Sequence, residues 1–271
     1  MARPDRAPTR LVLLGSPVAH SLSPRFQNAA LARAGLAVRY EAIDVAADAL
    51  DAVLATLVAE GAAGNVTVPH KARVAAVCAR RSALADQVGA VNTFWVEDGE
   101  LVGDNTDVGG FDHAVRRLRE TDSLPRRVAV LGAGGSAAAV LAAMADWPGA
   151  TARVWSRRPD QADVLCKRFT TVAGRAPTVE DAMAGADLVV NATPLGLDGS
   201  AMPVGPDRLP PGADVLDLVY RPGETAWVRA SRACGHRSAD GLAMLVEQGA
   251  LAFERWFGIL PDRAAMWASV R

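Results

Sequence analysis

Lysine is almost missing from this chain of 271 residues, although positive charge is plentiful. Of 29 basic residues only Lys71 and Lys167 are lysines, and the other 27 are arginines. A guanidinium stays protonated at any accessible pH, whereas the compact ammonium of lysine can exchange its proton. Each lysine is therefore a candidate for proton chemistry that the arginines cannot perform.

Cysteine, net charge and long apolar runs are scarce as well. Cys78, Cys166 and Cys234 are far apart and in no CxxC arrangement, so the sequence predicts neither a disulfide framework nor a metal site. We expect all three cysteines to be buried. A net charge of -1 argues against nucleic-acid binding. No run approaches the ~18 apolar residues of a membrane span, and no signal-peptide core is present, so we expect a cytoplasmic protein without membrane partners.

What the chain does contain is typical of a folded α/β protein. Half of its residues are hydrophobic and 22% are charged, and its length allows one large domain or two modest ones. Short β-branched or leucine-rich runs alternate with alanine-rich stretches, which predicts mostly parallel sheets. We expect strands at 10–14, 39–44, 65–68, 91–95, 127–131, 153–155, 188–191 and 215–218.

Capping signals delimit the helices between these strands. Ser23 is expected as an N-cap with Pro24 at the first helical position, and Gly35 as the stop of that helix. The segment 121–126 follows a helix and precedes a strand, so it resembles a seam between two domains. We expect further helices at 48–60, 106–119, 241–257 and 261–270.

A glycine-rich turn follows the strand at 127–131. It reads Gly132-Ala133-Gly134-Gly135-Ser136-Ala137, which is G-x-G-x-x-A between a strand and an alanine-rich helix. Gly132 would allow a tight turn, Gly134 would let the backbone approach a pyrophosphate, and Ala137 would let the helix pack closely on the strand. The alternative is a tight strand-to-helix turn without a ligand.

The next strand is followed by Ser156-Arg157-Arg158, where an NAD site would carry an acidic residue about 20 residues beyond the glycines. Two arginines favour the 2′-phosphate of NADP instead, with their guanidinium groups clamping the phosphate or stacking on adenine. A chain with 27 arginines also places such pairs on its surface by chance. A merely solvated pair is the alternative.

Four further segments place polar residues at the ends of predicted strands, where an open α/β sheet binds ligands. Each residue has a purely structural alternative, such as Ser23 as a cap, Asn65 as the end of a strand or Asp107 as the start of a helix. Together they supply hydroxyls, amides, a carboxylate and an ammonium, a set that suits a small polyhydroxylated acid. The segments are 21–23, 65–71, 90–93 and 105–107.

With these blocks in order, the chain resembles the shikimate dehydrogenase family over nearly its whole length. Asn65-Val-Thr-Val-Pro-His-Lys71 is similar to a substrate block of the family, and the turn at 132–137 is similar to its cofactor loop. The other matching blocks are 15–24, 89–93, 103–107, 191–196, 217–222 and 241–249.

The resemblance implies a fold and an activity. The fold is an N-terminal α/β substrate domain at 1–104, completed by C-terminal helices at 238–271 that return to it, and a Rossmann dinucleotide-binding domain at 105–237. The activity is the NADPH-dependent, reversible reduction of the ring ketone of 3-dehydroshikimate to shikimate.

The resemblance also implies roles for individual residues. Lys71 would be catalytic and paired with Asp107, while Ser21 and Ser23 would hold the substrate carboxylate with Tyr220 beside them. The residues that would hold the ring hydroxyls and position the reacting carbon are Asn65, Thr67, Asn92, Asp107 and Gln248. The residues that would bind NADP are Gly132, Ala133, Gly134, Gly135, Ser136, Ala137, Ser156, Arg157, Arg158, Asn191, Thr193, Leu218, Gly241 and Met244.

The chemistry explains why a lysine is wanted. Hydride addition to a ketone leaves an alkoxide, so the site must supply a positive charge and a proton at that oxygen. Lys71 can supply both, whereas an arginine could supply only the charge. Outside this role Lys71 would be an ordinary surface lysine, as Lys167 on its predicted helix is expected to be.

The chain departs from the family pattern at three places. The family often has Asn-Arg-Thr after the second Rossmann strand, and this chain has Ser156-Arg157-Arg158, which loses one amide and gains a second guanidinium. The residue after Asp107 is usually glycine and here is Val108, and Trp95 is bulkier than expected. These side chains could trim the pocket or simply pack between sheet and helix. Rival functions are a relative acting on quinate or aminoshikimate with NAD or NADP, a folate-linked dehydrogenase, and a non-catalytic binding or regulatory protein. A homodimer is possible, because the apolar C-terminal stretch could pack internally or against a partner.

Overall fold

The computed structural model describes residues 7–271, and the chain divides into two compact units. The first unit contains the chain up to Gly110 together with Leu245–Arg271, and the second contains Phe111–Met244. Both divisions fall inside helices, namely α5 (Asp107–Arg119) and α10 (Leu242–Phe257). The first unit is therefore discontinuous in sequence. The α/β class predicted from the sequence is confirmed.

The first unit is built on a six-stranded mixed sheet of order β2-β1-β3-β5-β6-β4. Strands β1, β2 and β3 are parallel, but β5 is antiparallel to both β3 and β6, so the expectation of a mostly parallel sheet is wrong for this half of the sheet. Asp98 and Gly99 join β5 to β6 with positive φ angles of 54° and 77°, as a tight hairpin turn requires. The strands are β1 (Leu11–Gly15), β2 (Tyr40–Asp44), β3 (Ala63–Val66), β4 (Arg80–Arg81), β5 (Thr93–Glu97) and β6 (Glu100–Asp104).

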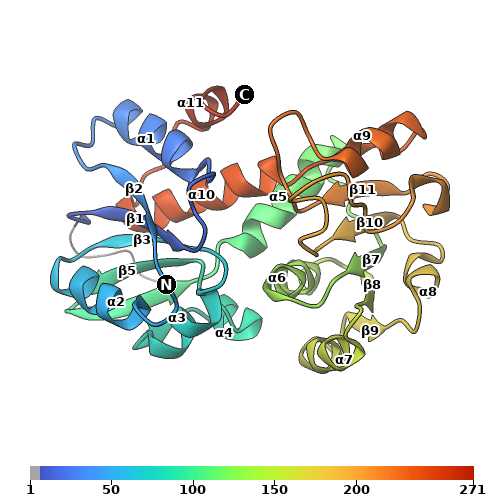
Figure 1. The fold of residues 1–271 in the computed structure, drawn as a ribbon, viewed down its shortest axis with the longest axis horizontal. Helices are drawn as coiled ribbons and strands as arrows, with labels where there is room; N and C mark the ends of the chain where they lie inside the picture. Colours follow the sequence, from blue (N-terminus) through green and yellow to red (C-terminus); the bar gives the residue numbers. More distant parts are fainter. Residues whose placement is uncertain (1–6) are drawn as a thin grey trace. The chain divides into compact units, whose positions relative to one another are not determined.

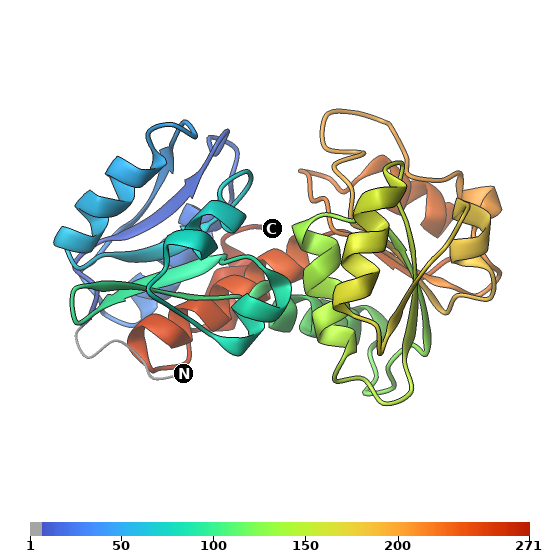
Figure 2. The same ribbon diagram turned by 90° about the horizontal axis from the view of Figure 1, so that it is seen from below.

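Helices cover both faces of this sheet (Figures 1 and 2). Val12 and Leu14 alternate along β1 with Leu11 and Leu13, and all four are buried because both faces carry apolar layers. In Figure 1, α1, α10 and α11 lie on one side of the sheet, and α2, α3 and α4 lie on the other. The remaining helix bounds are α1 (Ser23–Arg33), α2 (Leu50–Ala59), α3 (Lys71–Val77), α4 (Ala83–Val88) and α11 (Arg263–Ala268).

The start of α1 differs from the prediction. Ser23 is the first helical residue and Leu22 occupies the N-cap position, so the expectation that Ser23 caps the helix is wrong. The hydroxyl of Ser21 accepts the Ser23 N–H at 3.2 Å, which satisfies the first free donor of the helix from outside. Gly35 follows the helix with φ +67°, as expected of a stop.

The second unit is built on a fully parallel six-stranded sheet of order β12-β11-β10-β7-β8-β9. After β9 the chain returns to place β10 beside β7, and this reversal of strand order is where doubly wound sheets bind dinucleotides. The strands are β7 (Arg127–Leu131), β8 (Thr151–Trp155), β9 (Ala173–Arg175), β10 (Leu188–Asn191), β11 (Asp214–Asp217) and β12 (Ser238–Ala239). In Figure 1, α6 (Gly135–Met144) and α7 (Pro159–Arg168) lie on one side of this sheet, and α8 (Val179–Met183) and α9 (Ala226–Ala233) lie on the other.

The cysteines and the second lysine test the compositional expectations. Cys78 and Cys166 are buried as expected, but Cys234 is exposed just after α9, so its expected burial is wrong. Burial raises the pKa of the Cys78 thiol to about 11. Lys167 is exposed on α7, as predicted. Among residues 7–271 no helix is long and apolar enough to span a membrane.

Candidate active site and cofactor site

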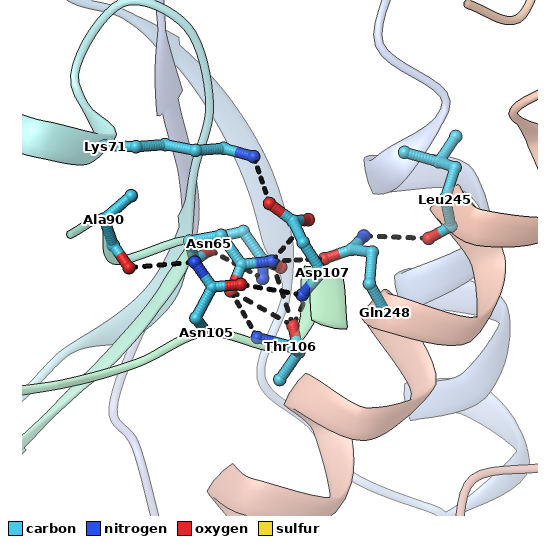
Figure 3. Close-up of polar contacts among 9 residues, drawn as sticks. Asn65, Lys71, Ala90, Asn105, Thr106, Asp107, Leu245 and Gln248 are labelled. Carbon is cyan, nitrogen blue, oxygen red and sulfur yellow. Dashed lines mark hydrogen bonds and ion pairs between the residues drawn. The ribbon is translucent and has the colours of Figure 1, made fainter. Parts of the chain in front are cut away.

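The first unit pairs Lys71 with Asp107. Lys71 is the first residue of α3 and Asp107 the first residue of α5, so two helix starts bring them together. The Lys71 Nζ donates a hydrogen bond to Asp107 Oδ2 at 2.6 Å (Figure 3). Their side chains retain 24% and 10% of their accessible surface, so the ammonium is partly buried but still open to a reactant. The pairing implied by the sequence is therefore present.

Asn92 links Asp107 to the rest of the site. Its Nδ2 lies 2.8 Å from Asp107 Oδ1, 3.0 Å from Thr106 Oγ1 and 3.1 Å from Gln248 Oε1. An amide nitrogen has only two protons, so these three acceptors share them. The Thr106 N–H donates to Asn92 Oδ1 at 2.7 Å. The second carboxylate oxygen of Asp107 is thus fixed by an amide while the first faces the ammonium.

Gln248 joins this network from the C-terminal part of the first unit. It lies on α10, and its Nε2 donates to the Leu245 carbonyl at 2.8 Å (Figure 3). Its Oε1 accepts from Asn92 Nδ2 at 3.1 Å. Gln248 comes late in the sequence, yet the resemblance places it at the same site as Asn92 and Asp107. The structure shows Gln248 in contact with Asn92, which in turn contacts Asp107.

Asn65 has both polar ends occupied within the chain. Its Oδ1 accepts the hydroxyl of Tyr40 at 2.8 Å, and its Nδ2 donates to the Asn92 carbonyl at 3.1 Å. The Tyr40 side chain is fully enclosed, and burial raises the pKa of its phenol well above the ordinary value. In this arrangement Asn65 supports the backbone of Asn92, and one amide proton and one lone pair of Oδ1 remain for a substrate hydroxyl.

The remaining first-unit residues predicted for the substrate site follow β1 and β3 in the chain. Ser23 is buried at the start of α1, and Ser21 and Thr67 are partly exposed. Thr67 follows β3 and is held by its backbone N–H on the Leu14 carbonyl at 2.8 Å, so its side chain stands at the edge where β1 and β3 end. Val108 and Trp95 are 6% and 0% exposed, so both pack inside the first unit.

Two members of the network, Tyr40 and Asp104, were not predicted from residue types. Tyr40 contacts Asn65 across 25 positions of sequence, and no local pattern indicates such a contact. Asp104 Oδ1 accepts the Asn105 N–H at 2.7 Å. Asp104 lies within the block 103–107 that carried the resemblance, so its place in that block was the available signal.

The glycine turn of the second unit lies between β7 and α6, as predicted. Gly132 has φ +121°, and a Cβ there would lie 2.6 Å from the Ala192 carbonyl oxygen, so only glycine fits. At Gly134 and Gly135 a Cβ would meet no atom within 4 Å, so this backbone is open to a ligand. Gly134 caps α6 without a side-chain hydrogen bond, which leaves the first N–H groups of the helix available to an anion. Ala133 and Ser136 are partly exposed beside these glycines, and Ala137 is buried under the helix.

Arg157 and Arg158 follow β8 and are exposed. Neither forms an ion pair with another residue of the described range 7–271, and no acidic side chain follows the strand in their place. The Ser156 hydroxyl accepts the Arg158 N–H at 3.2 Å and shapes this turn. The turn and the two arginines together fit a dinucleotide that carries a 2′-phosphate.

Beside the glycine turn, β10 and β11 end in a buried polar cluster. Asn191 Nδ2 donates to Asp217 Oδ1 at 2.8 Å, and Asn191 Oδ1 accepts the Thr193 hydroxyl at 2.6 Å. Burial raises the pKa of Asp217, whose Oδ2 accepts the Thr225 hydroxyl at 2.7 Å. These contacts fix the loops that follow β10 and β11 at the carboxyl edge of the sheet.

The other predicted cofactor residues lie just beyond that edge. A Cβ at Gly241 would lie 2.3 Å from the Leu218 carbonyl oxygen, so the chain entering α10 packs directly on the end of β11. Met244 is buried near the start of α10, and Tyr220 is partly buried after β11. Tyr220 belongs to the second unit, so its expected place beside Ser21 and Ser23 stays a prediction.

Among residues 7–271 no group of three or more His, Cys, Asp or Glu could hold a metal ion.

These two units define a class of protein. A parallel, doubly wound sheet with an open glycine turn, together with a second α/β unit that presents a lysine–carboxylate pair, is the architecture of a dinucleotide-dependent dehydrogenase. The chain belongs to the shikimate dehydrogenase family, because members of that family match it over most of its length. Residues 13–94 match the shikimate dehydrogenase substrate binding domain, and residues 241–271 match the shikimate 5'-dehydrogenase C-terminal domain.

Individual relatives support the same assignment. The chain is 40% identical over 264 residues to the shikimate dehydrogenase (NADP(+)) of Mesorhizobium japonicum, covering 96% of this chain and 94% of the relative. The structure of shikimate 5-dehydrogenase from Thermus thermophilus in complex with NADP(H) and shikimate is 39% identical, with a TM-score of 0.87 over 96% of this chain and 97% of that one. A quinate dehydrogenase from Corynebacterium glutamicum in complex with NAD is 30% identical, with a TM-score of 0.86 over 96% of this chain and 97% of that one.

Proposed function

We propose that this protein catalyses the reversible, NADPH-dependent reduction of 3-dehydroshikimate to shikimate. The observation that carries the proposal is the Lys71–Asp107 pair at 2.6 Å inside a network of amides, in a chain that matches shikimate dehydrogenases along its length. The first unit is the substrate domain and the second the NADP domain. The cytoplasmic location expected from the sequence stays a prediction, and the choice between monomer and homodimer stays open.

NADPH, when bound, supplies the hydride to the ring carbonyl carbon, and everything else is done by side chains. As the carbonyl oxygen gains negative charge, the Lys71 ammonium stabilises it and donates a proton to it. Asp107 holds the ammonium in place through its Oδ2, while Asn92 holds Asp107 through Oδ1. In the reverse direction neutral Lys71 accepts the proton of the shikimate hydroxyl.

Substrate groups are assigned as the resemblance to the shikimate dehydrogenase family implies. Ser21, Ser23 and Tyr220 hold the carboxylate, and Thr67, Asn92 and Gln248 contact the ring hydroxyls. Asn65 holds the Asn92 backbone and keeps one amide proton for a ring hydroxyl.

Cofactor contacts come from the second unit. The open backbone at Gly134 and Gly135 and the N-terminus of α6 receive the pyrophosphate. Arg157 and Arg158 receive the 2′-phosphate, with Ser156 shaping their turn. Asn191, Thr193, Leu218, Gly241 and Met244 line the nicotinamide end.

Initial rates with shikimate and with quinate, each with NADP⁺ and with NAD⁺, test the proposal. We expect the fastest turnover with shikimate and NADP⁺. Turnover on quinate with NAD⁺ alone would instead assign the protein to quinate oxidation, and absence of turnover with all four pairs would make it a binding protein.

A further inference from the structure

Asp104 is a buried carboxylate that the reaction does not use. It is the last residue of β6 and only 1% exposed. Its Oδ1 accepts the Asn105 N–H at 2.7 Å and the Ser82 hydroxyl, and its Oδ2 pairs with the Arg255 Nε at 2.9 Å. Burying a carboxylate costs free energy unless both of its oxygens have hydrogen-bond partners. Both oxygens of Asp104 have such partners.

The contacts of Asp104 lead directly to the catalytic carboxylate. Asp104 holds the backbone N–H of Asn105, and Asn105 Oδ1 in turn accepts the backbone N–H of Asp107 at 3.1 Å. The other end of the Asn105 side chain donates to the Ala90 carbonyl at 2.8 Å (Figure 3). Asn105 therefore links the start of α5, where Asp107 faces Lys71, to both Asp104 and Ala90.

Arg255 connects helix α10 to Asp104. It lies on α10 seven residues after Gln248, a spacing that returns to the same face of a helix. Gln248 meets Asn92 from that face, and Arg255 meets Asp104. The Arg255–Asp104 ion pair thus fixes α10 against β6. Gln248 lies two helical turns away from this ion pair on the same helix.

We propose that Asp104 and Arg255 are positioning residues, and that their ion pair sets both the orientation of Asp107 toward Lys71 and the reach of Gln248 toward Asn92. The inference rests on the function proposed above. Neither side chain touches the reacting atoms in this scheme. Loss of the pair should therefore lower the rate of the chemical step more than the affinity for NADP⁺, which is bound by the second unit.

The test compares Arg255→Met with Arg263→Met. Arg263 pairs with Glu247, which lies on α10 beside Gln248, through Nε and Oε2 at 3.0 Å. Both variants remove one half-exposed guanidinium from a buried carboxylate of the same unit, but only the first carboxylate holds the start of α5. The thermal unfolding midpoint, kcat for shikimate oxidation and KM for NADP⁺ are measured for each.

We expect Arg255→Met to lower kcat about tenfold to a hundredfold with little change in KM for NADP⁺, and Arg255→Lys to restore part of the rate. Arg263→Met should lower the unfolding midpoint by a similar amount and leave kcat unchanged. Adding Asp104→Asn to Arg255→Met should cost little further rate. If Asp104→Asn does not fold, the Arg255 variants decide alone.

Two results would overturn the positioning role. One is wild-type kcat in Arg255→Met, and the other is an equal loss of kcat in Arg263→Met, which would mark a general effect of stability. Wild-type protein is assayed in the same series. Absence of wild-type turnover would overturn the proposed function and this inference together, whereas active wild type with an unaffected Arg255→Met overturns the inference alone.

Discussion

The two units hold their polar groups in opposite ways. In the first, Asn92, Thr106, Asp107 and Gln248 are buried and bonded to one another, and these contacts fix the geometry around Lys71. In the second, the glycine backbone is open and two exposed arginines form no ion pairs among the described residues. The comparison teaches that the groups proposed for chemistry need a fixed mutual geometry, whereas the groups proposed to hold a long cofactor need to be accessible.

The largest expected effect is at Lys71. Lys71→Ala and Lys71→Arg should each lower kcat by about two to four orders of magnitude while the KM for shikimate changes little, because the lost proton transfer belongs to the transition state. Steady-state kinetics in both directions measure this. Lys167→Ala, at the exposed lysine on α7, serves as control and should match the wild type. Wild-type rates in Lys71→Arg would show that charge alone suffices and would break the proposed mechanism.

The glycine turn provides the corresponding test of the second unit. Gly132→Ala places a methyl group 2.6 Å from the Ala192 carbonyl oxygen at φ +121°, so we expect loss of NADPH binding and about 1–3 kcal/mol of stability. Fluorescence titration with NADPH and chemical unfolding report the two effects. The control is Gly149→Ala, also at positive φ but with no atom within 4 Å, which should cost about 1 kcal/mol and keep binding intact. Normal NADPH affinity in Gly132→Ala would contradict the role of this turn.

The arginine pair should give a smaller and more selective change. Removing both guanidinium groups in Arg157→Ala/Arg158→Ala should raise the KM for NADPH about tenfold to a hundredfold and leave the KM for NADH nearly unchanged, because only NADPH carries the 2′-phosphate. The ratio of the two kcat/KM values measures this preference. Arg153→Ala, at another exposed arginine on β8, is the matched control. An equal loss with both cofactors would make the pair a general anion attractor.

The smallest effect concerns the thiols, and it compares interior with surface rather than catalysis with binding. Cys78 is buried in the first unit and its thiol pKa is raised to about 11 by that burial, so it should not react with iodoacetamide in the native protein. Exposed Cys234 should react first, and Cys166, whose pKa is also raised by burial, should follow only on unfolding. Mass spectrometry of timed samples gives the order. Early labelling of Cys78 would indicate that the core of the first unit opens readily.

The parallel sheet of the second unit was the easier half to predict. Strands at 127–131 and 188–191 match the prediction at both ends, because strands buried on both faces read as continuous apolar runs. The two-residue strands β4 and β12 are too short to leave any pattern. The hairpin of β5 and β6 was missed although Asp98-Gly99 is a strong turn signal, because the alternation of strands and helices along the rest of the chain favours parallel neighbours.

For the candidate site, the residues could be predicted from the sequence, but their mutual geometry could not. Lys71, Asp107, Asn92 and Gln248 could be singled out because they lie in blocks that resemble a known family. Their mutual distances, and the occupation of both ends of Asn65, depend on tertiary contacts that no local pattern encodes. Ser23 illustrates the limit even for a local rule, because Leu22 occupies the cap position and Ser23 begins the helix.

The discontinuity of the first unit has a consequence for the order of assembly during synthesis. The second unit ends at Met244, so all of it has been translated before the last segment of the first unit, Leu245–Arg271, emerges from the ribosome. Gln248 and Arg255 belong to that segment, and Asn92 and Asp104 must wait for them. A nascent chain can therefore complete its second unit before its first, and the proposed catalytic arrangement forms only after residues 245–271 have been translated.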